Sequence, residues 1–151
     1  HWEEYIRFDN SSYILRHGSI NNYNSSLSME LFKRNIFSTS AVICKKKYII
    51  EAGLFDSTLP NGQDYDLWLK MSPNIKLKVI PEVLGTYFEE EGSITSRPYY
   101  RRVISELRIL WKHKNKGNGK LFLFKFFKIV ISKQWFFSFK NLILKNKSHS
   151  Y

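Results

Sequence analysis

Two carboxylates, Asp64 and Asp66, stand at the start of a helical pattern in residues 60–70, PNGQDYDLWLK. Asp is a mediocre helix former, and one acidic residue would be enough to cap the helix. A carboxylate at a helix N-terminus is favoured in its charged form by the helix dipole, which suits a general base. The alternative is that both residues are first-turn acids with a purely structural role.

The His and Cys residues give weaker evidence for a functional site than the two carboxylates do. The four His residues, at positions 1, 17, 113 and 149, are scattered without metal-ligand spacing and are predicted to be incidental surface residues. A single cysteine, Cys44, excludes a disulfide framework and a four-Cys zinc site. It lies in an apolar run, which predicts a small buried side chain.

The composition predicts a folded body with a basic tail. The 151 residues are 43% hydrophobic and 17% aromatic, enough for one domain with a core. Residues 1–110 carry 14 Lys and Arg against 13 Asp and Glu, whereas residues 111–151 carry 10 Lys and no acid. The net charge of +11 is therefore almost entirely a property of the tail, unlike that of a uniformly basic nucleic-acid binder.

The opening HWEEYIRF lacks a signal-peptide pattern and suggests a segment of a longer protein.

The sequence predicts helices and strands in alternation, and these elements would hold the two carboxylates in place. Apolar residues at helical spacing predict helices in residues 26–35, 45–55, 63–71 and 99–114. Alternating or β-branched runs predict two strands joined by a turn in residues 4–18, a buried strand in residues 36–44, and strands in residues 75–82 and 83–91.

Two segments of this order carry a family resemblance. They are residues 35–71, NIFSTSAVICKKKYIIEAGLFDSTLPNGQDYDLWLKM, and residues 78–96, KVIPEVLGTYFEEEGSITS. A basic turn, a helix ending in Gly-x-Phe-Asp, an Asp-x-Asp-Leu-Trp helix start, an Ile-Pro strand and a Gly-Ser-x-x-Ser loop follow one another. This order resembles the second half of family 2 glycosyltransferases, and the likeness covers about residues 27–97.

The resemblance implies an α/β fold class, the C-terminal part of the Rossmann-like GT-A fold. Residues 1–97 would form the acceptor and catalytic-base half of that domain, and residues 98–151 a helical, basic, aromatic-rich, membrane-associating extension. It also implies an inverting, hexosyltransferase-like enzyme that transfers a sugar from a nucleotide-sugar donor to a hydroxyl acceptor in cell-surface polysaccharide or glycolipid assembly. The family's processive Gln-x-x-Arg-Trp motif is absent from the sequence, which favours transfer of one sugar.

The resemblance assigns roles to individual residues. Asp64 matches the family's catalytic base, whereas Asp66 is expected to position the loop and Trp68 to pack beneath the site. The expected substrate-binding set, acting directly or by positioning, is Asn61, Gln63, Asp66, Trp68 and Arg97. Gln63 departs from the family, which has an acid there, so no acidic role is expected at that position.

The family's metal motif is not expected in this chain. The intact enzyme would hold Mg²⁺ or Mn²⁺ through an Asp-x-Asp motif in an upstream half that the chain lacks. Asp64-x-Asp66 fits these letters but stands in the place of the base. The isolated chain is therefore expected to transfer sugar poorly, and a degenerate gene product remains a third possibility.

The tail segment 121–131, LFLFKFFKIVI, is too short to span a bilayer. Aromatic residues with Lys and no acid suit a helix in the membrane interface, which predicts a cytoplasmic enzyme peripheral on the inner membrane face and a lipid-linked acceptor. The alternatives are a helix docked on the missing half with its lysines outward, or RNA binding. The rival to catalysis is a non-catalytic basic module that binds membrane or nucleic acid.

Overall fold

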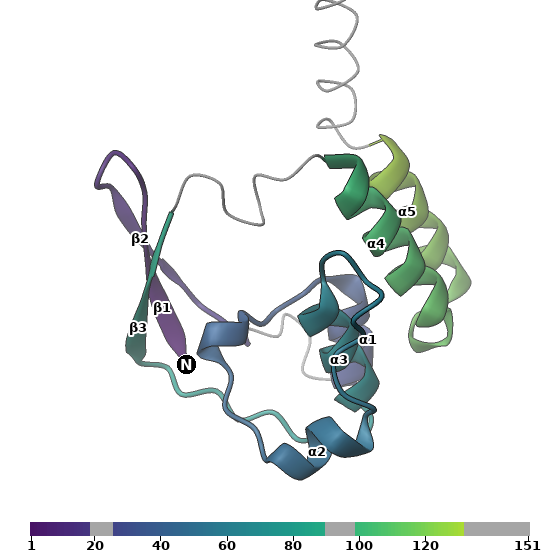
Figure 1. The fold of residues 1–151 in the computed structure, drawn as a ribbon, viewed down its shortest axis with the longest axis horizontal. Helices are drawn as coiled ribbons and strands as arrows, with labels where there is room; N and C mark the ends of the chain where they lie inside the picture. Colours follow the sequence, from purple (N-terminus) through teal and green to yellow (C-terminus); the bar gives the residue numbers. More distant parts are fainter. Residues whose placement is uncertain (19–25, 90–98, 132–151) are drawn as a thin grey trace, which may run out of the picture.

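The computed structural model describes residues 1–18, 26–89 and 99–131 as a small mixed sheet beside a group of helices (Figure 1). The strands are β1 (Trp2–Ile6), β2 (Ser12–Leu15) and β3 (Val83–Phe88), in the order β2-β1-β3. β1 runs antiparallel to β2 and parallel to β3. The described chain is thus mixed α/β, as the sequence predicts.

The β1–β2 hairpin forms where the sequence places a turn. Asp9 accepts hydrogen bonds from the Ser11 amide at 2.9 Å and the Ser11 hydroxyl at 2.6 Å. Asn10 adopts a left-handed backbone conformation, with φ at 60°, which Asn tolerates better than most residues. The Tyr5 ring lies 5.0 Å from that of Tyr13 and 5.3 Å from that of Tyr87. These cross-strand aromatic contacts stabilise the three-stranded arrangement.

The helices confirm the four helical patterns, and the tail, which was also expected to be helical, contains one helix among its described residues. The helices are α1 (Leu27–Lys33), α2 (Lys46–Glu51), α3 (Gln63–Met71), α4 (Tyr99–Lys112) and α5 (Gly119–Ile131), with single 3-10 turns at Thr39–Ala41 and Lys114–Lys116. The Ser26 hydroxyl caps α1 by accepting from the Met29 amide at 3.2 Å. α2 ends where Gly53 enters the left-handed region, with φ at 81°.

The hydrophobic core is helical and leaves the sheet outside. Its buried members are Leu31, Phe32, Ile36, Leu59, Leu67, Trp68, Leu69, Met71, Ile109, Leu110 and Ile129. Residues from both sides of the predicted boundary at 97/98 share this core. α4 and α5 therefore do not form a separate hydrophobic unit among the described residues.

Two predicted strands are wrong. Residues 36–44 form a 3-10 turn flanked by extended chain, and residues 75–82 contain no strand. A β-branched, apolar run becomes a strand only when a neighbouring strand pairs with its backbone groups. Neither segment has such a partner in the described structure, and Cys44, predicted to be buried, is exposed as a result.

α5 lies beside α4 (Figure 1). One side of α5 is partly buried and the other is exposed. Its inward positions are Leu121, Phe122, Lys125 and Ile129. Phe124 and Phe127 are 65% and 54% exposed. Lys125 binds Phe32 and Tyr65, so it does not point outward as the docked-helix alternative expects. Docking of this helix on an upstream half stays a prediction. Within the three described ranges, no helix is long and apolar enough to cross a bilayer.

Candidate functional site

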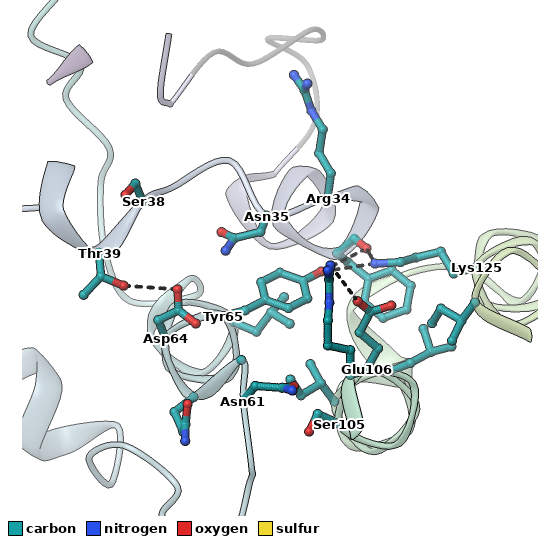
Figure 2. A pocket seen from close by; sticks show the side chains of 18 of the residues that line it. Arg34, Asn35, Ser38, Thr39, Asn61, Asp64, Tyr65, Ser105, Glu106 and Lys125 are labelled. Carbon is teal, nitrogen blue, oxygen red and sulfur yellow. Dashed lines mark hydrogen bonds and ion pairs between the residues drawn. The ribbon is translucent and has the colours of Figure 1, made fainter. Parts of the chain in front are cut away.

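A pocket of about 1210 Å³ lies between the N-terminal end of α3, the segment after α1, and helices α4 and α5. Asn61, Gln63 and Asp64 line it from the α3 side. Figure 2 shows Asp64 and Thr39 at one end, with Lys125 and Glu106 grouped near the Tyr65 hydroxyl at the other. The pocket thus places a fixed carboxylate at one end and mainly basic groups at the other.

Asp64 is held in place by its helix and by Thr39. The Thr39 hydroxyl donates to Asp64 Oδ2 at 3.1 Å, and Asp64 is the second residue of α3. The N-cap is Gly62, in the left-handed region with φ at 74°. A Cβ at Gly62 would lie only 3.0 Å from Ile109 Cδ1. Glycine is therefore favoured here both by backbone conformation and by the close approach of α4.

Asp66 faces away from the pocket and joins α3 to the end of α4. Its side chain is fully buried, with His113 Nε2 donating to Oδ1 at 2.8 Å. Oδ2 lies 3.0 Å from the ammonium groups of both Lys70 and Lys112. Burial raises the pKa of this carboxyl, but the hydrogen bonds from His113, Lys112 and Lys70 outweigh burial and hold the pKa well below its usual range.

Two polar atoms at the pocket are buried without a hydrogen-bond partner among the described residues. They are Asn61 Nδ2 and Ser105 Oγ, from the loop before α3 and from α4. Leaving such groups unpaired costs about 1–3 kcal/mol each. Gln63 is different, because its Nε2 donates to the Leu59 carbonyl at 2.7 Å and so holds the loop. Asn61 and Ser105 are therefore better placed than Gln63 Nε2 to meet a ligand hydroxyl.

The remaining predicted residues lie elsewhere. Trp68 is 3% exposed, packs edge-to-face with Phe37 at 6.0 Å, and does not line the pocket. The structure thus gives Trp68 and Asp66 supporting positions rather than contact with a pocket ligand. Arg97 lies outside the described residues.

Tyr65 and Lys125 link α3 to α1 and α5. The Tyr65 hydroxyl donates to the Leu31 carbonyl at 2.7 Å and accepts from Lys125 Nζ at 3.1 Å. Burial, with a smaller effect from the Glu106 carboxylate, raises the pKa of Tyr65 above its ordinary value. Tyr65 therefore stays a neutral hydroxyl and fixes the turn that carries Asp64.

Sequence reasoning missed several of these residues. His113, predicted to be incidental at the surface, is 6% exposed and bound to Asp66, so that prediction is wrong. Lys125 and Ser105 were also missed, because their pocket positions depend on the packing of α4 and α5. The Asp66–Lys70 pair, by contrast, had a local signal, namely its i,i+4 spacing on a helix.

The described part of the chain contains no group of three or more His, Cys, Asp or Glu side chains arranged to hold a metal. Asp66 Oδ1 is taken by His113, and Oδ2 by two lysines. Because three cationic or hydrogen-bonding groups already satisfy this carboxylate, Asp64-x-Asp66 cannot act as a chelating pair without breaking them.

Comparisons with known proteins give no family assignment. No protein-family model, no curated protein and no solved structure matches the chain.

Proposed function

We propose that the chain is the acceptor and catalytic-base half of an inverting, GT-A-type glycosyltransferase that transfers one sugar from a nucleotide-sugar donor to a hydroxyl. The observation that carries this proposal is Asp64, a carboxylate in the first turn of α3 that lines the pocket and is oriented by Thr39. A general base must be fixed beside the hydroxyl that it deprotonates.

In the proposed reaction, the acceptor hydroxyl oxygen bonds to the anomeric carbon of the donor sugar. The bond from that carbon to the phosphate oxygen breaks, and the nucleotide leaves with the electron pair. Asp64 takes the hydroxyl proton, and attack from the face opposite the leaving group inverts the anomeric configuration. The unpaired Asn61 Nδ2 and Ser105 Oγ offer hydrogen bonds that would orient a sugar hydroxyl nearby.

The sheet supports the proposal that this chain completes a larger domain. Sheets bury at least one face against another layer. Here Leu84 and Phe88 on β3 are 58% and 60% exposed, and Ile14 on β2 is 50% exposed. A nucleotide-binding half upstream would cover such residues, and its Asp-x-Asp would hold the Mg²⁺ or Mn²⁺ that offsets leaving-group charge.

The test uses the chain together with the in-frame segment encoded upstream of His1. This protein should release nucleotide from one member of a panel of nucleotide sugars in the presence of a sugar or lipid-linked acceptor, and chelation should abolish the release. NMR of the product should show an inverted anomeric centre. A retained configuration, or no turnover with any donor, would contradict the proposal.

Membrane association is the second part of the proposed function. Phe124, Phe127 and Ile131 expose an aromatic and apolar face of α5, and Lys120 and Lys128 are exposed on the same helix. Residues 111–151 add 10 Lys without an acid. This combination suits the interface of an anionic bilayer, which supports a peripheral enzyme on the inner membrane face with a lipid-linked acceptor.

Vesicle co-sedimentation tests this part. The chain should bind vesicles containing phosphatidylglycerol and should bind phosphatidylcholine vesicles weakly, with binding reduced by salt. Changing Phe124 and Phe127 together to Ser should weaken binding at least tenfold, because about 1.5–3 kcal/mol accompanies full burial of one such side chain. Ile43→Ser, which removes an 86% exposed side chain away from α5, is the control. Equal loss in both variants would argue against docking through α5.

A further inference from the structure

Lys125 is a largely buried cation whose hydrogen-bond partners are neutral. Its ammonium group donates to the Phe32 carbonyl and to the Tyr65 hydroxyl, and it lies over both aromatic rings. No carboxylate of the described chain lies within ion-pair distance of it. An ammonium has three hydrogens, so two acceptors leave one donor unused. Since buried charges are normally paired, an anion would complete this environment.

Four further cations line the same pocket, and two of them, Lys128 and Arg102, belong to α5 and α4. Lys128 follows Lys125 on α5, close enough that its charge acts against the charged form of Lys125. Arg102 on α4 lies 3.9 Å from Glu106, a separation at which an exposed ion pair holds only loosely. α4 and α5 thus bring three positive charges to the pocket, with Glu106 acting on two of them, Arg102 and Lys125. The mutual repulsion of these charges would fall when an anion binds.

We propose that Lys125, Lys128 and Arg102 form a subsite for a phosphate group carried by a substrate of this pocket. The inference rests on the proposed function and deepens it, because a phosphate would arrive either on a lipid-linked acceptor or on the nucleotide-sugar donor. α5 supplies two of the three cations, the largely buried Lys125 and the exposed Lys128, and both line the pocket. The same helix carries the exposed aromatic residues. One helix would thus hold the phosphate and face the lipid.

The subsite should depend on pH. Burial lowers the pKa of Lys125 to about 8, with Glu106 opposing this shift and Lys128 adding to it. The charged and titratable groups around Lys125 are Lys33 at the end of α1, Arg34 directly after it, Tyr65 on α3, Arg102 and Glu106 on α4, and Lys128 on α5. A bound phosphate favours the protonated amine, so binding should be strongest below about pH 8 and weaken as the pH rises through it.

Isothermal titration of the 151-residue chain with inorganic pyrophosphate at fixed ionic strength tests the subsite. At pH 7, Lys125→Met and Lys128→Met should each weaken binding about tenfold, because a charge-assisted hydrogen bond is lost. Glu106→Gln should strengthen it. Lys120→Met removes an exposed lysine of α5 that does not line the pocket, and should leave the affinity unchanged. Circular dichroism checks that each variant is folded; if Lys125→Met is not, Lys128→Met and Glu106→Gln decide.

Two phosphate-bearing probes identify the source of the group. A short prenyl diphosphate that binds more tightly than pyrophosphate assigns the phosphate to a lipid-linked acceptor, whereas a nucleoside diphosphate that does so assigns it to the donor. No saturable pyrophosphate binding, or one affinity shared by Lys128→Met, Glu106→Gln and Lys120→Met, would overturn the subsite. Since the titration requires no sugar transfer, its failure leaves the transfer proposal standing, and failed transfer leaves the subsite standing.

Discussion

Asp66→Ala should lower the free energy of unfolding by about 3–5 kcal/mol, a value typical of removing one partner from a buried ionic network. The carboxylate is fully buried and binds His113, Lys70 and Lys112. Without it, His113 keeps a buried ring nitrogen with no acceptor, and two ammonium groups lose the charge between them. The link between α3 and the end of α4 is lost at the same time.

Urea unfolding followed by circular dichroism measures this change. The matched control is Asp56→Ala, because Asp56 also contacts Lys112, at 3.1 Å, but is more exposed. Its loss should be much smaller. A difference of less than about 1 kcal/mol between wild type and Asp66→Ala would mean that the network stabilises the fold far less than buried networks usually do.

Acid titration gives the same prediction a second readout. The folded-state pKa of Asp66 lies below its unfolded value, which is near 4. Its contribution to stability is therefore complete above about pH 4 and is lost as the pH falls below that value. Wild type should lose more stability than Asp66→Ala between about pH 4 and pH 2, so the two unfolding curves should converge in acid.

Local signals in the sequence were enough for the helices and the hairpin. Ser26 caps α1, Gly53 ends α2, and the Asp9–Ser11 turn closes the hairpin, all through contacts within a few residues. The strands predicted in residues 36–44 and 75–82 lacked this local determination, because a strand depends on a partner elsewhere in the chain. Apolar composition alone could not supply that partner.

The residues of the candidate site also fall into two kinds: those that a local sequence motif can identify and those that depend on distant contacts. Asp64, Asn61 and Gln63 are near one another in sequence and line one pocket, so a motif could find them. Lys125 reaches Tyr65 across 60 residues, and His113 reaches Asp66 across 47. No spacing rule connects such pairs. They follow from the way α4 and α5 pack, which is why His113 was expected at the surface and the basic end of the pocket was missed.

Asp64 and Asp66, the two acids of the opening motif, have different surroundings in the structure. Asp66 points into the structure and is satisfied by three protein groups, whereas Asp64 lines the pocket with Thr39 as its hydrogen-bond donor. Residues two apart at the start of a helix point in different directions. The pair therefore combines a supporting anion with a carboxylate available for chemistry, and substitutions at the two positions should affect different properties.

Asp64→Asn should reduce sugar transfer by about 10²–10⁴-fold, the range expected for losing general base catalysis. The assay uses the chain with its upstream segment, saturating donor and acceptor, and initial rates of nucleotide release. Asn keeps the size of Asp and can still accept the Thr39 hydrogen bond, but it cannot take up the acceptor proton. The fall should therefore appear in kcat, with the KM for donor little changed, and urea unfolding should match wild type.

Asp9→Asn is the matched control, since it removes a carboxylate from the β1–β2 turn, outside the pocket. It should leave turnover unchanged. A kcat for Asp64→Asn within a few-fold of wild type would remove Asp64 as the base, and with it the observation on which the transfer proposal rests. Loss of vesicle binding in Asp64→Asn would be equally damaging, because the carboxylate lies at the end of the pocket away from Lys125 on α5 (Figure 2). The proposed enzyme thus requires that catalysis follow Asp64 and that membrane binding follow α5, each independent of the other.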